Sequence, residues 1–332
     1  MTRYARQARF SPFGEQGQAQ LEAFHVLIIG AGALGSHTAE MLVRMGVGRL
    51  TIADMDIVEM SNLHRQAVYN EQDVVEMLPK VEALKHKLGA VNSEVPISTL
   101  YMEVTPTNIS QLIHETQPDV IIDGMDNFKM RYLINEAACE AQIPWIYGAV
   151  VGSKGSVYAF DFTGPCLKCL FGEMPETAES CAINGILPPV VQQVASMQVS
   201  ELLRYASGNG FSKKLVTIDT FQVKYQTMNV DALKDTDCRV CSQHDYQLLN
   251  HNEHHPIEDL CGNAIRFRLK PQVFDHAELL PGTIVKRNNF ATIIHYEDYT
   301  LTLFKDGRMN VHGLTEDTDV KTLFNTINKS FK

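Results

Sequence analysis

The chain has 332 residues, of which 45% are hydrophobic and 20% charged, and its formal net charge at pH 7 is −10. These values are ordinary for a soluble globular protein with one large α/β domain and a small appendage. The negative charge argues against a general nucleic-acid or anionic-membrane binder, which would need a basic face. No apolar run approaches the ~20 residues that cross a bilayer, and the N-terminus lacks the apolar core of a signal peptide. We therefore predict a cytoplasmic protein.

The N-terminal segment Arg3-Tyr4-Ala5-Arg6-Gln7 precedes a predicted helix around Gly14–Glu22. Taken alone, such a charged segment is most simply a solvated stretch of chain.

A predicted strand–turn–helix–strand unit follows. The apolar run His25–Ile29 leads into a glycine-rich turn at 30–35, a helical stretch ends at Met45, and a second apolar run, Arg49–Ala53, ends in Asp54. The glycines permit a tight turn and close approach to a phosphate, whose charge the helix N-terminus stabilises. An acid about 20 residues beyond the last glycine is placed to bind ribose hydroxyls. The unit predicts an adenine-nucleotide site.

A polar, cationic segment then runs from Ser61 to Gln66, shortly after Asp54-Met55-Asp56. An arginine beside an asparagine, just beyond the ribose-binding acid, suits a triphosphate. A hydride-transferring enzyme has no evident use for this segment. An NAD-dependent oxidoreductase, which would share the glycines and Asp54, is therefore the weaker alternative.

Pro79 is predicted to occupy the first position of a helix that runs to about Val91. Lys80 then lies in the first turn, where an unpaired cation opposes the helix dipole. A nearby phosphate would explain this lysine; a plain surface lysine is the alternative.

The segment Gly124–Asn127 follows a short buried strand predicted at Asp119–Asp123 and precedes a helix predicted at Phe128–Ala141. It therefore lies at the carboxyl edge of the sheet, where ligands bind in open α/β folds. Asp126 could cap the helix, or it could hold Mg²⁺ between phosphates. Further elements are predicted here as the strands Val95–Tyr101, Pro144–Val151 and Gly155–Phe162 and the helix Asn108–Thr116.

Two C-x-x-C pairs, Cys166/Cys169 and Cys238/Cys241, suggest a metal. Two such pairs can complete a tetrahedral Zn–S₄ site, which leaves no position open for chemistry and is therefore structural. Two separate redox pairs are the alternative.

Between the pairs, the segment 171–189 is rich in small and turn residues and reads as a loop ahead of a helix at Val190–Ala206. It contains Cys181, which taken alone is a free loop thiol. Two strands are predicted next, at Leu215–Thr220 and Phe221–Val230.

Residues 1–243 are predicted to form the nucleotide-binding domain, 244–256 a linker and 257–332 a small α+β appendage. Within the appendage we predict strands at Ala264–Leu269, Tyr299–Phe304 and Met309–His312 and a terminal helix at Asp317–Ser330. The sequence predicts no function for it.

With these motifs in view, residues 3 to 243 resemble the MoeB/ThiF/HesA family of ubiquitin-activating-type adenylyltransferases. The resemblance implies a Rossmann-like mixed sheet with helices on both faces. It also implies ATP-dependent adenylation, with Mg²⁺, of the C-terminal Gly-Gly carboxylate of a small ubiquitin-like sulfur-carrier protein, with release of pyrophosphate.

The resemblance also assigns roles. Arg6 would reach the phosphates bound by the neighbouring subunit of a homodimer, and Asp126 would be required for adenylation. Cys181 would lie in the loop over the adenylate, where some relatives capture the activated group on a cysteine. Ala33 departs from the commoner glycine at its position. The nucleotide-binding residues expected on this basis are Gly30, Gly32, Ala33, Gly35, Asp54, Asp56, Ser61, Asn62, Leu63, His64, Arg65, Gln66, Lys80, Asp126 and Asn127.

The carrier itself could be MoaD-like, serving molybdopterin, or ThiS-like, serving thiamine; we lean slightly to molybdopterin. An adenylating enzyme for a small-molecule, peptide or tRNA acceptor would share the nucleotide site. A third alternative is a non-catalytic binding module that acts as a scaffold for partners. The presence of Arg65, Lys80 and Asp126 argues against that hypothesis.

Overall fold

The computed structural model describes residues 3–173, 185–251, 255–260, 264–315 and 317–329. Cys181 therefore lies outside the described residues. The chain divides into two compact units, one of Met1–Asp73 with Pro79–Asn252 and one of Val74–Leu78 with Glu253–Lys332.

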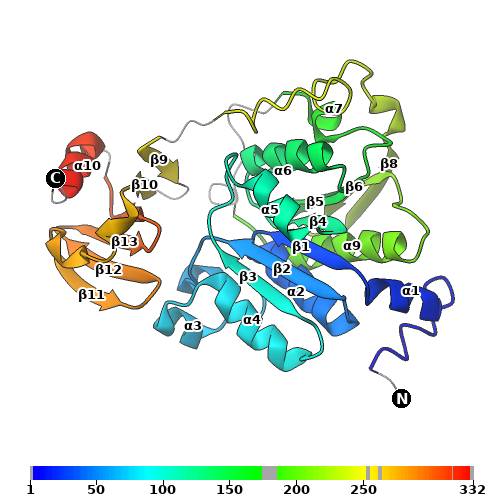
Figure 1. Ribbon diagram of the computed structural model, residues 1–332, viewed down its shortest axis with the longest axis horizontal. Helices are drawn as coiled ribbons and strands as arrows, with labels where there is room; N and C mark the ends of the chain where they lie inside the picture. The colour runs from blue at the N-terminus through cyan, green and yellow to red at the C-terminus, as the bar shows by residue number, and fades with distance from the viewer. Residues whose placement is uncertain (1–2, 174–184, 252–254, 261–263, 316, 330–332) are drawn as a thin grey trace. The chain divides into compact units, whose positions relative to one another are not determined.

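The first unit is built on an 8-stranded sheet in the order β3-β2-β1-β4-β5-β6-β7-β8 (Figure 1). Neighbours from β3 to β5 are parallel, and the pairs from β5 to β8 are antiparallel. The predicted mixed α/β sheet is thus confirmed. Its strands are β1 (His25–Ile29), β2 (Arg49–Asp54), β3 (Ile97–Tyr101), β4 (Val120–Asp123), β5 (Trp145–Val151), β6 (Lys154–Phe160), β7 (Lys214–Asp219) and β8 (Lys224–Asn229).

Helices flank this sheet. α2 packs against α4 and α9, and α5 packs against α6. Parallel strands require such crossover helices, and these bury the strands between them: all residues of β1 and β4 are buried. The helices are α1 (Gly14–Leu21), α2 (Ala33–Met45), α3 (Glu71–Glu76), α4 (Lys80–Val91), α5 (Ile109–Thr116), α6 (Phe128–Ala141), α7 (Leu167–Phe171) and α9 (Pro188–Ala206).

The hairpin between β7 and β8 corrects one predicted boundary. Phe221 was expected to begin a strand, but it belongs to the turn, since Asp219 Oδ1 accepts the N–H groups of Phe221 (3.2 Å) and Gln222 (3.1 Å). Val223 has a φ of 53° and ends the turn, so β8 begins at Lys224.

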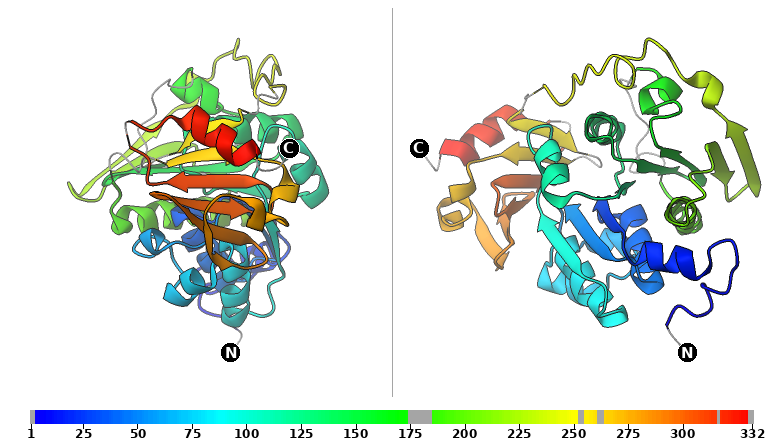
Figure 2. Two further views of the ribbon diagram at one scale, coloured as in Figure 1. Left: turned by 90° about the vertical axis from the view of Figure 1, so that its left-hand side faces the viewer. Right: turned by 45° about the vertical axis from the view of Figure 1, so that its right-hand side comes forward.

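The second unit is built on a 6-stranded antiparallel sheet in the order β11-β12-β13-β14-β10-β9 and includes the helix α10 (Figure 2, left). Leu323 and Ile327 of α10 join its apolar core. The helix starts later than predicted because Asp319 accepts the N–H of Thr322 (3.1 Å) and acts as a cap. The elements are β9 (Ile257–Leu260), β10 (Ala264–Arg268), β11 (Thr283–Arg287), β12 (Ala291–Tyr296), β13 (Tyr299–Phe304), β14 (Arg308–His312) and α10 (Val320–Lys329).

Among the described residues, no helix combines the length and the apolar content that crossing a bilayer demands.

Candidate nucleotide site and cysteine cluster

The candidate site lies at β1, the strand where the order of the parallel strands reverses. β1 lies between β2 and β4, and ligands of open α/β sheets bind outside the carboxyl ends of the strands at such a point. Gly30 and Gly124 follow β1 and β4, and their backbones nearly touch: a Cβ on Gly124 would lie 2.3 Å from the carbonyl oxygen of Gly30. A Cβ on Gly35 would lie 1.8 Å from the same oxygen. Close packing against the Gly30 carbonyl oxygen therefore requires glycine at both 35 and 124.

Asp54 holds this turn from the end of β2. Its Oδ2 accepts the N–H of Ala31 and its Oδ1 accepts the N–H of Asp56, each at 2.7 Å. Burial raises the pKa of Asp54, while Lys80 opposes and Asp56 adds to that shift. Each carboxylate oxygen keeps a second lone pair, which is compatible with accepting a ribose hydroxyl.

Lys80 has a partner, which corrects the premise that it is an unpaired cation. Its Nζ lies 3.0 Å from Asp56 Oδ2, and its side chain is only 7% exposed. Burial disfavours its charge, but Asp56 and Asp54 outweigh that effect and raise the pKa of Lys80, so the amine is protonated at neutral pH. The lysine opens α4, with its own N–H donated to the carbonyl oxygen of Asp56.

The predicted segment Ser61–Gln66 forms a short turn around a 3₁₀ helix at Met60–Asn62. Arg65 donates from Nη1 to the carbonyl oxygen of Ser61 (2.8 Å), and His64 Nδ1 lies 3.1 Å from the same oxygen. Gln66 is buried, its Oε1 has no hydrogen-bond partner among the described residues, and its Nε2 would lie 3.9 Å from a Cβ on Gly32. The structure thus brings Gln66 to the glycine turn.

Asp126 is exposed at the carboxyl end of β4, and its Oδ1 accepts the side-chain N–H of Asn127 at 3.2 Å. The cap of α6 is Asn127, whose Oδ1 accepts the N–H of Met130 (2.9 Å). Capping therefore does not explain Asp126. An exposed carboxylate oxygen at this edge fits the oxygen ligands that Mg²⁺ prefers.

Two residues of this edge were not anticipated from the sequence. Asp123, fully buried at the end of β4, pairs with Arg131 of α6, with 2.9 Å between Oδ2 and Nε. Burial raises the pKa of Asp123 and Arg131 opposes it. The sequence did contain a clue to this pair: Asp123 ends the apolar strand VIID, and Arg131 lies among the apolar residues of the helix segment FKMRYLI.

The N-terminal segment is anchored far from the glycine turn of its own chain. Tyr4 accepts a hydrogen bond from Asn92 Nδ2 (2.8 Å), and Gln7 Nε2 donates to the carbonyl oxygen of Met45 (2.8 Å). Arg6, between these anchors, is exposed. Met45 ends α2, whose other end is the glycine turn, and a helix of 13 residues is about 20 Å long.

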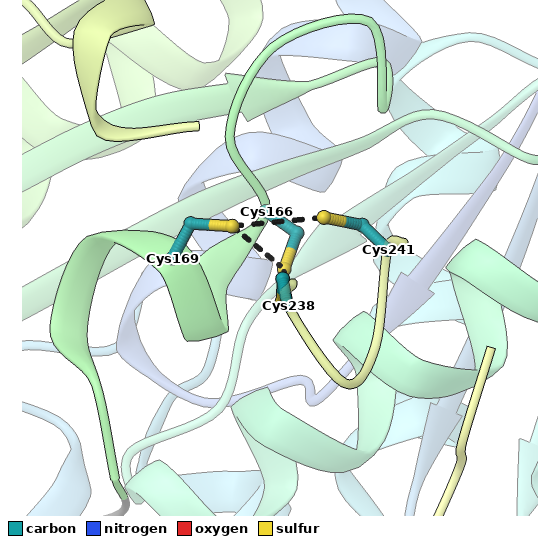
Figure 3. A group of neighbouring side chains, drawn as sticks. All are labelled: Cys166, Cys169, Cys238 and Cys241. Carbon is teal, nitrogen blue, oxygen red and sulfur yellow. Dashed lines mark hydrogen bonds between the residues drawn. The ribbon is translucent and has the colours of Figure 1, made fainter. Parts of the chain in front are cut away.

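The four cysteines of the C-x-x-C pairs come together at α7 (Figure 3). Their sulfur atoms all lie within 4.8 Å of one another, with 3.8 Å between Cys166 and Cys169 and 3.6 Å between Cys166 and Cys238 and between Cys169 and Cys241. A tetrahedron with Zn–S bonds of about 2.3 Å has sulfur separations of about 3.8 Å. The cluster therefore fits one four-thiolate zinc ion better than two separate redox pairs.

Side chains of α6 hold both halves of this cluster. Asn135 Oδ1 accepts the N–H of Leu167 (3.0 Å), next to Cys166. Buried Glu136 accepts the N–H of Leu248 at 2.8 Å, shortly after the second pair. The helix that follows Asp126 and Asn127 thus also supports the cysteines.

Comparison with known proteins places these features in one family. A model described as the ThiF family matches residues 4–240. The sulfur carrier protein ThiS adenylyltransferase of Bacillus subtilis is 36% identical over 330 residues, covering 97% of this chain and 98% of that protein. The sulfur carrier protein adenylyltransferase of Thermus thermophilus is 33% identical, covering 73% of this chain and 90% of that protein.

MOCS3 of Aedes aegypti, an adenylyltransferase and sulfurtransferase, is 34% identical over 247 residues. This match covers 73% of the chain and 55% of MOCS3, so the chain spans about half the length of that relative. The crystal structure of E. coli MccB with ATP has a TM-score of 0.62 at 21% identity, covering 72% of this chain and 74% of that one, and shows a shared fold.

Proposed function

Because the chain belongs to the ThiF family and is an adenylyltransferase, we propose that it activates the C-terminal carboxylate of a ThiS-like sulfur-carrier protein. The observation that carries this proposal is the match to the ThiS adenylyltransferase of Bacillus subtilis over 98% of its length. That match includes the second unit, whereas the MOCS3 and Thermus relatives align with only 73% of the chain. This coverage moves our preference from the molybdopterin to the thiamine carrier.

The proposed reaction joins the carrier's carboxylate to the α-phosphate of ATP and releases pyrophosphate. A carboxylate is a poor electrophile because its oxygen leaves badly, and AMP is a much better leaving group. The attack develops negative charge on the phosphate oxygens, so catalysis needs positioned cations more than acid–base groups.

The cations proposed for this task are Arg65, Lys80 and Arg6, with Asn62 as a hydrogen-bond donor. Lys80 is held at this edge of the sheet by Asp56, and its own side chain is only 7% exposed, so its charge is screened less than that of a surface lysine. Asp54, at the end of β2, would accept the ribose hydroxyls while it keeps the glycine turn in place.

Asp126 would hold Mg²⁺, which supplies charge neutralisation on the phosphates when it is bound. The proposed substrate tail ends in two glycines, which carry no Cβ and can pass through a channel too narrow for other residues. The cysteine cluster would hold a structural zinc ion that fastens the region after β8 to α7.

Arg6 is proposed to act on the nucleotide of a partner subunit in a homodimer. Its anchors sit at the end of α2 opposite the glycine turn, about 20 Å along that helix, so its own site is out of reach.

Mixing two inactive variants tests this proposal. We expect Arg6→Ala and Asp126→Ala each to lose activity alone, and a mixture allowed to exchange subunits to recover up to about a quarter of the wild-type rate, because half the dimers are mixed and each has one intact site. Recovery is measured as pyrophosphate exchange. Absence of recovery, with mixed dimers shown by native mass spectrometry, would place Arg6 at its own site or at none.

The function itself is tested by carrier-dependent exchange of labelled pyrophosphate into ATP. We expect exchange with a ThiS-like carrier ending in Gly-Gly and little with a MoaD-like carrier of the same length. A shortened carrier without the two glycines is the control. Exchange with the MoaD-like carrier alone would reverse the assignment, and exchange with a small carboxylic acid or peptide in place of either carrier would favour the alternative acceptor.

A further inference from the structure

One buried ion pair fixes the residue that precedes Asp126. Asp123 Oδ1 accepts the N–H of Met125 at 2.8 Å, and Arg131 Nη2 donates to the carbonyl oxygen of Met125 at 2.6 Å. Both backbone groups of the residue before Asp126 are therefore bound by the pair.

The same pair reaches the neighbouring strand. Arg131 Nη2 donates to the carbonyl oxygen of Gly148 in β5 (3.0 Å), and Asp123 Oδ2 accepts the Gly148 N–H at 3.4 Å. Gln198 of α9 donates to the carbonyl oxygen of Asp123 at 2.8 Å, which adds a third element. The Met125 turn is thus tied to β5 and α9 as well as to α6.

Aromatic rings shield the guanidinium. Its central carbon lies 5.5 Å from the ring centroids of both Phe128 and Tyr147. The side chains of Arg131 and Asp123 are 5% and 0% exposed. Burying two charges costs several kcal/mol per ion, and well-packed apolar residues are often as stable or more so. Stability alone therefore does not account for this pair.

We propose that the Asp123–Arg131 pair is a positioning device for the Asp126 carboxylate, an inference that rests on the proposed adenylation. The guanidinium of Arg131 is a rigid fork that donates from Nε to the carboxylate of Asp123 and from Nη2 to the carbonyl oxygen of Met125. It therefore holds the end of β4 and the Met125 turn at one fixed separation. A lysine offers a single nitrogen and does not have this geometry. Neither residue of the pair touches substrate in this account; both act through the placement of Asp126.

Arg131→Lys and Asp123→Asn test the proposal, because the first keeps the buried charge and the second keeps the shape. We expect kcat for pyrophosphate exchange to fall roughly 10–100-fold, as for other residues that orient a metal-binding group. The Mg²⁺ concentration for half-maximal exchange should rise at least about tenfold. KM for ATP should change less than about threefold, and binding of ATP without Mg²⁺ should not change, because uniform binding is left intact.

Arg268→Lys is the matched control, since Arg268 forms a similar pair with Glu258 in the second unit (2.9 Å). It should change neither kcat nor the Mg²⁺ requirement. Thermal unfolding shows whether each variant is folded at the assay temperature. If Arg131→Lys is unfolded there, Asp123→Asn alone carries the test.

Three results would overturn the inference. A folded variant with wild-type kcat and Mg²⁺ dependence would show that the pair does not position Asp126. Parallel losses of kcat, KM and metal-free ATP binding would show a general structural role. Absence of exchange in the wild-type protein would instead reject the proposed function, and the inference with it.

Discussion

Asp126→Ala is expected to lower carrier-dependent pyrophosphate exchange by at least about 1000-fold, while ATP still binds. A metal ion stabilises the charge of such a transition state by several kcal/mol, and each 1.36 kcal/mol is a factor of ten in rate. Asp126 is exposed, and Asn127 caps α6 in its place, so the variant should keep its fold.

Initial rates of exchange and the affinity for ATP are measured on the same preparation. Asp275→Ala, which removes an exposed aspartate of the second unit, is the matched control and should retain the full rate. A loss smaller than about tenfold in Asp126→Ala would contradict the assignment of this carboxylate to the metal.

Cys238→Ser is expected to lose zinc and to be the least stable of the variants considered. The wild-type protein should hold one zinc ion per chain, because the four sulfur atoms have the separations of a Zn–S₄ tetrahedron. Metal binding at such a site contributes directly to the free energy of folding, so we expect several kcal/mol of destabilisation.

Zinc content is measured by elemental analysis and stability by urea unfolding. Cys139→Ser is the matched control, since Cys139 is also buried beside the cluster but contacts the carbonyl oxygen of Val240 (3.8 Å). Burial raises the pKa of Cys139 to about 11, so its thiol stays protonated near neutral pH. A full complement of zinc in Cys238→Ser, or none in the wild type, would contradict the zinc assignment.

Local patterns predicted most of the framework of the first unit. β1, β2 and α6 were found within a residue of their observed ends, because apolar runs, the glycine turn and helix periodicity are properties of adjacent residues. The cysteine pairs were recognisable for the same reason: C-x-x-C is a local spacing, and the structure brings the two pairs to one point.

Pairings between distant residues could not be predicted. The partner of Lys80 is Asp56, on a different element, and only the fold brings their side chains to 3.0 Å. Likewise, Asp123 and Arg131 are charged residues in apolar stretches of sequence, and only the fold, which brings the end of β4 against α6, pairs them. In the second unit, β9, β11 and β12 were not predicted. The β11 segment, TIVKR, is short and mostly exposed, which leaves little alternation to detect.

The most direct test of the account is chemical trapping of the activated carrier. A ThiS-like carrier is incubated with the enzyme, ATP, Mg²⁺ and hydroxylamine, and its intact mass and C-terminal peptide are measured. The account predicts a hydroxamate on the terminal glycine that requires ATP and is absent with Asp126→Ala. ATP consumption with an unmodified carrier C-terminus, or a hydroxamate on another carboxylate, would contradict adenylation of the carrier.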